Sequence, residues 1–170
     1  VRTYIDIPFN NDFVDIQIDI KELIPLENFE LGWRFDKTHN PDISESEKEL
    51  ILALSEDESK RLNKIIDFFE NENYLSDKYS ETDWMSASSE NQEKIERFRS
   101  QLEVILKPWN EDILISWQRK TVLKTTKEIF LKYWTDYLYA GSDDVTIISE
   151  KTNWILFYKH FEVANVWTLK

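Results

Sequence analysis

The chain has 170 residues, enough to bury the core of one domain, and it lacks cysteine, which excludes disulfides and thiolate metal sites. Its formal net charge is −12, and because an acidic surface repels phosphate we do not expect nucleic-acid binding as the main role. No apolar run approaches the roughly 20 residues of a membrane-spanning helix, and the start shows no signal-peptide pattern, so we expect a cytoplasmic protein with no membrane contact.

The first forty residues favour extended structure. Residues 1–9 predict a short strand that ends at Pro8 and an Asn-Asn-Asp turn. Residues 13–21 alternate strictly between branched apolar and polar side chains, which is typical of a strand with one exposed, charged face. Alternation in 31–35 indicates another possible strand.

Three helices are predicted in the middle of the chain from the spacing of capping boxes, in which a serine precedes a glutamate or glutamine by three residues. The three pairs are Ser44 with Glu47, Ser55 with Glu58, and Ser89 with Gln92. The apolar residues expected to be buried are Leu50, Ile51 and Leu54; then Leu62, Ile65, Ile66 and Phe69; then Ile95, Phe98, Leu102 and Ile105, before Pro108.

Two stretches complete the middle of the chain. Residues 71–88 are polar and irregular, and they predict a long surface loop anchored by its aromatic side chains. Residues 112–118 hold four large apolar residues and predict a strand.

The last 46 residues predict a helix followed by strands. Thr125 and Glu128 have capping-box spacing, and the helix they open should end near Tyr139 or Ala140, because Gly141 suits a left-handed C-terminal cap. Steps of three and four place one set of residues on a single buried face. That set is Ile129, Phe130, Tyr133, Trp134, Tyr137 and Leu138.

Strands are expected after the glycine. Branched residues at 145–148 favour a strand, and 150–153 form a polar turn. The run 154–161 is almost continuously apolar and predicts a central strand covered on both faces. Residues 163–169 are read as a last strand. Together these elements predict a single α+β domain over 1–170, with an antiparallel sheet packed against about four helices.

Two groups of residues near this turn and strand are candidates for function. The neighbouring carboxylates Asp143 and Asp144 could hold a cation or a basic partner residue, or they could bond their own backbone in a turn. His160 and Glu162 lie two apart on one strand face, a spacing found in zinc deaminases, but the cysteines of such a site are absent. We expect Trp154 to be a core residue, and to belong to a partner surface if it is exposed.

The tail also shows a resemblance. The segments 130–134 (FLKYW), 142–145 (SDDV), 153–158 (NWILFY) and 160–162 (HFE) resemble the C-terminal half of small bacterial domains of unknown function. Some of these are candidate immunity proteins of polymorphic toxin systems. The resemblance implies a cytosolic, non-enzymatic and acidic protein that blocks a toxin by binding it.

The charge distribution agrees with a binding role. Residues 41–112 carry 19 acidic and 9 basic residues, whereas 113–170 carry 6 acidic and 8 basic residues. A negative field of this kind speeds association with a basic partner. We therefore expect a binding protein for a basic protein partner, with no cofactor and no metal. The alternatives are a carboxylate-dependent hydrolase that uses Asp143, Asp144 and Glu162, or a structural interaction module.

Overall fold

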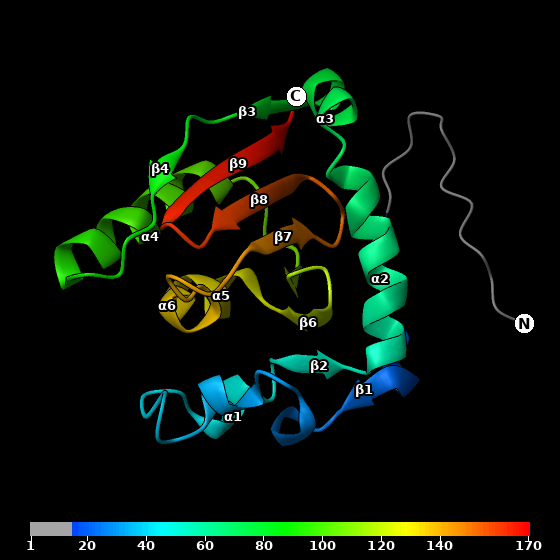
Figure 1. The fold of residues 1–170 in the computed structure, drawn as a ribbon, viewed down its shortest axis with the longest axis vertical. Helices are drawn as coiled ribbons and strands as arrows, with labels where there is room; N and C mark the ends of the chain where they lie inside the picture. The colour runs from blue at the N-terminus through cyan, green and yellow to red at the C-terminus, as the bar shows by residue number, and fades with distance from the viewer. Residues whose placement is uncertain (1–14) are drawn as a thin grey trace, which may run out of the picture.

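The computed structural model describes residues 15–170, and its centre is one antiparallel sheet (Figure 1). The strands of the described residues pair in the order β1-β2-β6-β5-β7-β8-β9-β3, and β4 also pairs with β9. Their bounds are β1 Leu23–Ile24, β2 Leu52–Leu54, β3 Tyr79–Glu81, β4 Met85–Ser86, β5 Ile113–Trp117, β6 Thr121–Thr125, β7 Val145–Ser149, β8 Trp154–Lys159 and β9 Val163–Leu169.

Helices flank the sheet on both faces. The α-helices of residues 15–170 are α1 Glu45–Lys48, α2 Glu56–Phe69, α3 Glu72–Lys78, α4 Gln92–Leu106, α5 Lys127–Lys132 and α6 Trp134–Tyr137. Three short 3-10 helices, η1 Ile20–Glu22, η2 Leu26–Asn28 and η3 Gly32–Phe35, precede them. The predicted α+β class, with an antiparallel sheet packed against helices, is confirmed, although α1 and α6 have only four residues each.

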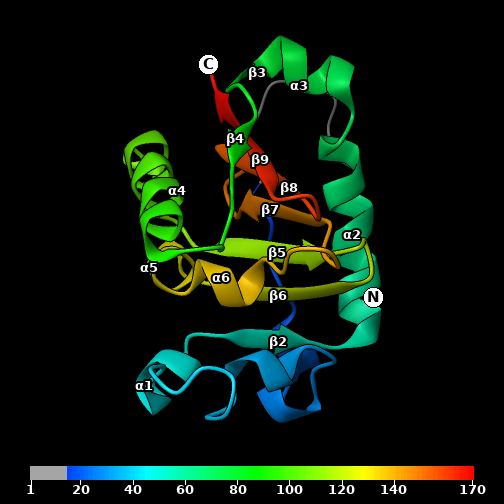
Figure 2. The same ribbon diagram turned by 60° about the vertical axis from the view of Figure 1, so that its left-hand side comes forward.

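Alternation along the strands divides the core into two layers. One face of the sheet packs against α4, α5 and α6, and this layer contains the fully buried Trp134, Trp154 and Phe98. The other face packs against α2 through Leu62, Ile66 and their neighbours. Figure 2 shows the strands between α4 on one side and α2 on the other.

The C-terminal elements match the predictions best. Strands β7, β8 and β9 form where they were expected, and β8 pairs with both neighbours, as a central strand does. The strand predicted for 154–161 is shorter in the structure, since β8 ends at Lys159. Phe161 is 65% exposed at the tip of the β8–β9 hairpin.

The predicted helix from Thr125 needs three corrections. Thr125 is the last residue of β6, and Thr126 is the N-cap, its hydroxyl accepting a hydrogen bond from the Ile129 amide at 3.1 Å. The helix is broken at Tyr133 into α5 and α6, and it ends at Tyr137 instead of near Tyr139 or Ala140. The predicted apolar face is nevertheless buried throughout.

Gly141 does have the left-handed backbone that was expected, with φ of +80°. It lies in a turn beyond the end of α6, so it is not the helix cap that the sequence indicated.

The front third differs from its prediction. The strand predicted for 1–9 lies outside the described residues. The strand predicted for 13–21 is not found in the described part, since 15–19 are irregular and Ile20 begins η1. Residues 32–35 form η3 instead of a strand. At Gly32 a Cβ would lie 1.9 Å from the carbonyl oxygen of Leu26, so the tight turn at this position requires glycine.

In the middle, two of the three predicted N-caps are confirmed. Ser44 forms the predicted capping box with Glu47, and the Ser55 hydroxyl caps α2. The cap of α4 is Asn91, not Ser89.

Three further corrections concern the residues around these helices. Leu50 is 47% exposed, and Leu54 belongs to β2 instead of a helix. The segment 71–88, predicted as a loop, contains α3, β3 and β4, because β9 offers a free edge with which the two short strands pair.

Candidate functional site

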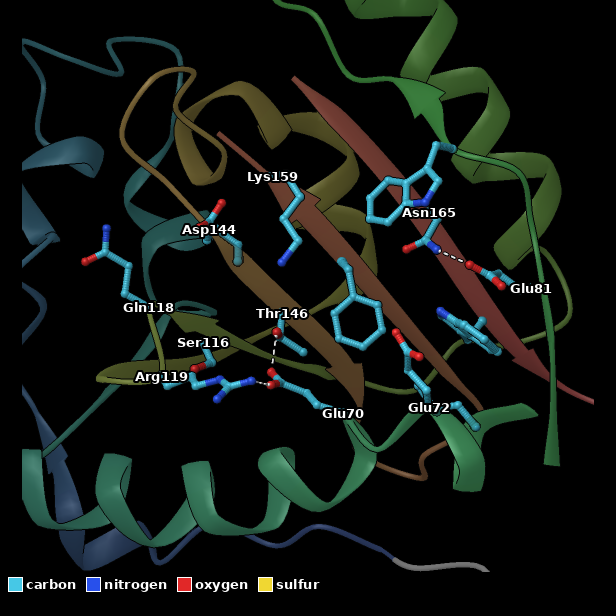
Figure 3. Close-up of a pocket in the computed structure, with 15 residues that line it drawn as sticks. Glu70, Glu72, Glu81, Ser116, Gln118, Arg119, Asp144, Thr146, Lys159 and Asn165 are labelled. Atoms are coloured by element: carbon cyan, nitrogen blue, oxygen red, sulfur yellow. Dashed lines mark hydrogen bonds and ion pairs between the residues drawn. The ribbon is translucent and has the colours of Figure 1, made fainter. Parts of the chain in front are cut away.

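A groove lies on the sheet face that α2 covers only in part (Figure 3). Its cavity volume is ≈ 600 Å³. It runs from the β5–β6 hairpin, across β7 and β8, to the segment that connects β3 and β4. The lining residues are Glu70, Glu72, Leu75, Glu81, Trp84, Ser116, Gln118, Arg119, Asp144, Val145, Thr146, Phe157, Lys159, Asn165 and Trp167.

The floor of the groove is one row of residues set by the strand register. Ser116 on β5 pairs with Thr146 on β7, which pairs with Phe157 on β8, which pairs with Asn165 on β9. Directly paired residues of antiparallel strands point to the same face, so these four side chains form a line across the sheet. The row two residues along is entirely apolar and belongs to the core under α2. The floor therefore begins where the apolar core ends.

The C-terminal end of α2 forms one wall. The Thr146 hydroxyl donates a hydrogen bond to Glu70 Oε1 at 2.8 Å, and Arg119 forms an ion pair with the other oxygen of Glu70. Arg119 also lies 3.5 Å from Asp67 Oδ1. The positive charge of Arg119 is thus balanced within the wall.

Where α2 covers the floor, it supplies a buried polar contact. The Ser116 hydroxyl donates to Asn63 Oδ1 at 2.5 Å, and both residues are at least 95% buried. Asn63 Nδ2 has no hydrogen-bond partner among the described residues. The contact fixes the Ser116 side chain against α2 and links α2 to β5.

A strained hairpin closes one end. Gln118 and Arg119 have φ of +50° and +55°, a left-handed backbone that non-glycine residues rarely adopt. Gln118 is held by its backbone amide to Asp144 O and by its side-chain amide to Ser142 O, each at 2.9 Å. These bonds tie the β5–β6 hairpin to the start of β7 and thereby shape this end of the groove.

The opposite end combines carboxylates with aromatic rings. Glu81 pairs with Trp167 across β3 and β9, and Asn165 Nδ2 donates a hydrogen bond to Glu81 Oε1 at 2.7 Å. Glu72 and Glu81 are exposed, and neither forms an ion pair with a described residue. Trp84 is 49% exposed beside them. We call the five residues Glu72, Glu81, Trp84, Asn165 and Trp167 the acidic end of the groove.

The structure gives the predicted Asp143 a buried role outside the groove lining. Its carboxylate forms a two-point ion pair with Arg34 and accepts hydrogen bonds from the Tyr139 amide at 2.8 Å and the Ser142 hydroxyl at 3.0 Å. Asp143 is 4% exposed. All of its oxygen atoms are therefore used within the protein.

Asp144 and His160 are brought together at the surface. Asp144 Oδ1 accepts a hydrogen bond from the His160 amide at 3.0 Å and lies 3.0 Å from its ring Nδ1. Partial burial disfavours ionisation of Asp144, but the hydrogen bonds from His160 outweigh it and lower the pKa of the carboxyl below its usual value. Asp144 lines the groove, whereas His160 lies outside its lining.

The other two predicted site residues are elsewhere. Trp154 is fully buried in the layer under α4, α5 and α6, as expected of a core residue, and it presents no surface to a partner. Glu162 has φ of +62° in the β8–β9 turn, and its Oε1 accepts a hydrogen bond from the Ser89 amide at 3.4 Å. Of the three carboxylates named for a hydrolase, only Asp144 lines the groove.

Sequence reasoning missed most of the lining, although a signal was present. Ser116, Thr146 and Asn165 are polar residues with an apolar neighbour on each side within their strands. Each is 8% exposed or less, so each strand places a polar side chain in a buried position at this point. A search for such interruptions would have found the floor residues but not their alignment.

Two negative findings apply to residues 15–170. No three of their histidine, aspartate and glutamate side chains converge closely enough to hold a metal ion. None of their helices has the length and apolar character that crossing a membrane requires.

Comparison with known proteins places the chain in a family. No curated protein and no solved structure matches it. One family model matches residues 23–165, well over half of the chain and the whole groove lining except Trp167. The chain therefore belongs to the family described as Protein of unknown function (DUF2947).

Proposed function

We propose that the protein is a non-enzymatic binding protein that holds a basic segment of a partner protein in the groove. The observation that carries this proposal is the acidic end, where Glu72 and Glu81 are exposed without a cationic partner among the described residues. A basic segment supplies the missing charge, and charge-assisted hydrogen bonds to carboxylates are among the stronger polar contacts in proteins.

The distribution of charge along the chain supports the same role. The acidic stretch 41–112 contributes Glu70, Glu72 and Glu81 to the groove, and the basic tail contributes Arg119 and Lys159. Arg119 is already paired with Glu70. The negative field of the stretch 41–112 would steer a basic partner toward the surface that carries the free carboxylates, which raises the association rate.

The groove also suits a protein segment by its composition. Polar floor residues beside aromatic side chains offer hydrogen bonds together with apolar contact area, the combination found at binding surfaces. The proposed binding role therefore depends on the groove residues, and neither Asp143 nor Glu162 is among them.

More specifically, we propose that the protein is a bacterial immunity protein of the cytoplasm that neutralises a basic toxin. The support for this form is the resemblance of the tail to candidate immunity proteins, together with the acidic charge. An immunity gene lies directly behind its toxin gene, so the genomic neighbourhood tests it. The product of the neighbouring gene should arrest growth when it is expressed alone, and co-expression of this chain should restore growth. A neighbour without toxicity, or toxicity that co-expression leaves unchanged, would contradict the immunity form.

The binding role itself is tested by a two-dimensional ¹H–¹⁵N NMR titration. The probes are a short capped peptide of alternating glycine and arginine or lysine, and a matched peptide with glutamate at the charged positions. We expect the basic peptide to shift the amide signals of groove residues such as Glu72, Glu81 and Thr146, and the acidic peptide to leave them unchanged. Equal shifts from both peptides, or shifts confined to residues outside the groove, would contradict the proposal.

A further inference from the structure

We propose that the acidic end of the groove is a subsite for the guanidinium group of an arginine side chain. This inference rests on the proposed binding function and specifies the chemistry that the groove recognises. It concerns Glu72, Glu81, Trp84, Asn165 and Trp167 (Figure 3 labels the two glutamates and the asparagine).

Glu81 is held in one orientation by a neighbouring strand. Its Oε1 accepts the hydrogen bond of 2.7 Å from Asn165 Nδ2, and Asn165 is only 2% exposed. A buried amide on β9 therefore holds an exposed carboxylate in a fixed direction. The second oxygen of Glu81 has no partner among the described residues and is left to accept from a ligand. Glu72 adds a second carboxylate without a cationic partner in the described chain.

Asn165 also supplies an unpaired acceptor. Asn165 Oδ1 is buried and has no hydrogen-bond partner among the described residues, while Nδ2 of the same amide is paired. Buried polar atoms in proteins normally have a partner, so the atom points to a ligand that carries N–H or O–H donors. In Figure 3 this oxygen is directed toward the interior of the groove and away from Glu81. A cation without N–H groups, such as a quaternary ammonium, would leave it unpaired.

The aromatic lining of this end favours arginine over lysine. Trp84 is 49% exposed, Phe157 is partly exposed, and Trp167 pairs with Glu81 across the strands. A guanidinium is planar, stacks on aromatic faces and presents five donors in one plane, so it can bond two acceptors while it stacks. A lysine ammonium is compact and strongly hydrated, and it loses more solvation in the same place.

The charge of the rest of the groove directs the arginine to this end. Arg119 and Lys159 lie toward the opposite end (Figure 3), where Arg119 is paired with Glu70 and Lys159 lies near Asp144. Only the acidic end offers carboxylates free of cations among the described residues. Asn165 Oδ1 is covered, so a guanidinium reaches it only after a side chain of the lining moves. Trp84 is our candidate for that side chain, because it is the most exposed aromatic residue of the lining.

The test is an NMR titration of the full chain with three capped glycine–serine peptides that differ only in one central residue: arginine, lysine or citrulline. Citrulline has nearly the shape of arginine but no charge. The chain contains seven tryptophans, so resolved indole N–H signals are used instead of fluorescence. We expect the arginine peptide to shift the Trp84 indole and Asn165 side-chain amide signals, with an affinity about tenfold above that of the citrulline peptide.

Variants assign the effect to the subsite. Glu81→Gln and Trp84→Ala should each weaken binding of the arginine peptide at least about fivefold. Two matched controls should leave it unchanged: Glu49→Gln, an exposed carboxylate on another part of the surface, and Trp33→Ala, a tryptophan that is 43% exposed outside the groove. Both groove variants change exposed residues, and amide spectra without peptide show that each variant is folded.

The outcomes separate this inference from the proposed function. If lysine and arginine peptides bind equally in the groove and both exceed citrulline, the arginine subsite is refuted and the binding of basic segments stands. If the citrulline and arginine peptides bind equally, or if Glu81→Gln and Trp84→Ala leave the signal shifts unchanged, both the arginine subsite and the proposed binding function are overturned. The expected order of arginine, then lysine, then citrulline, with losses in the two groove variants only, supports both.

Discussion

Arg34 and Asp143 form a buried ion pair with two contacts, 2.7 Å between Nη1 and Oδ2 and 3.0 Å between Nη2 and Oδ1. Their side chains are 4% and 6% exposed, and 109 residues separate them in the chain. The guanidinium also stacks on Tyr139, with its central carbon 3.9 Å from the ring centroid. The pair fastens η3 to the segment before β7, next to the Asp144 end of the groove.

Removing one partner of this pair should be costly. We expect Asp143→Ala to lower the free energy of unfolding by about 3–5 kcal/mol, because it leaves the Arg34 charge buried without a counter-ion. Lys60→Ala, which breaks an exposed pair with Glu56, is the control and should cost less than about 1 kcal/mol. Guanidinium-chloride melts measure both. A cost for Asp143→Ala as small as that of the control would show that the pair does not hold the fold together.

The two buried tryptophans allow a matched comparison. Truncating either Trp134 or Trp154 to alanine should cost about 3–5 kcal/mol, since both are fully buried. Replacement by phenylalanine should separate them. Trp134 Nε1 donates to Ile95 O at 3.3 Å, whereas Trp154 Nε1 has no partner among the described residues. Trp154→Phe should therefore cost about 1 kcal/mol less than Trp134→Phe in the same melts, and the reverse order would contradict this assignment.

Asp136 gives the fold a dependence on pH. Burial is the main cause that raises the pKa of its carboxyl to about 6, while the nearby Arg34 opposes the rise. The folded state thus binds more protons than the unfolded state between the usual carboxyl pKa, about 4, and pH 6. The contribution of Asp136 to stability is most favourable at low pH and falls as pH rises through this window.

The variant Asp136→Asn removes this titration. It should raise the free energy of unfolding by about 1 kcal/mol at pH 7.5, a value reduced for the partial exposure of the group, and by little at pH 4. Asn40 Nδ2, which donates to Asp136 at 3.1 Å, can donate equally to an asparagine carbonyl. Melts at the two pH values measure the difference. A variant less stable than the natural chain at pH 7.5 would show that the attraction to Arg34 outweighs burial.

Substitution of Glu162, one of the predicted site residues, tests whether its role is structural. Its φ of +62° is strained for any residue except glycine. Glu162→Gly should raise the free energy of unfolding by about 0.5–1 kcal/mol, since the hydrogen bond from Ser89 is long. Glu162→Ala keeps the strain and serves as the control, with no gain expected. A loss of stability in the glycine variant would mean that the contact with Ser89 outweighs the backbone strain.

The sequence predicted the elements whose signals are local. The α2 cap at Ser55 and its buried residues, and the strands β7 to β9, follow from capping spacing and apolar runs that tertiary contacts do not alter. Thr125 and Thr126 show the limit of such signals. Either threonine could cap a helix, and only the pairing of β5 with β6 decides that Thr125 belongs to a strand.

The groove could not be predicted in the same way. Its floor depends on register: Ser116, Thr146 and Asn165 align only because the pairings of β5 with β7, β7 with β8 and β8 with β9 set the offsets between their strands. The first of these pairings joins strands that β6, α5 and α6 separate in the chain. Its acidic end depends on β3, which came from a segment read as a loop because two or three residues are too few to show alternation. Of the predicted pair, Asp144 lines the groove and Asp143 does not, so the two carboxylates have separate roles.

The most direct test of the account is the salt dependence of binding in a charge-reversed groove. The double variant Glu72→Lys/Glu81→Lys is compared with Glu49→Lys/Glu93→Lys, which changes the net charge equally at exposed positions outside the groove lining. The basic glycine–arginine/lysine peptide is the probe, and the NMR titration is repeated from 0.02 to 0.5 M salt. The account predicts binding to the natural chain that weakens as salt rises, because the screening length falls to about 8 Å at 0.15 M.

The same account predicts that the groove variant loses at least about tenfold in affinity, whereas the matched control loses less than about threefold. Equal losses in the two variants would show that net charge alone attracts the peptide and that the groove does not hold it. Binding that ignores both salt and the reversal of Glu72 and Glu81 would contradict the central claim that this groove receives a basic segment.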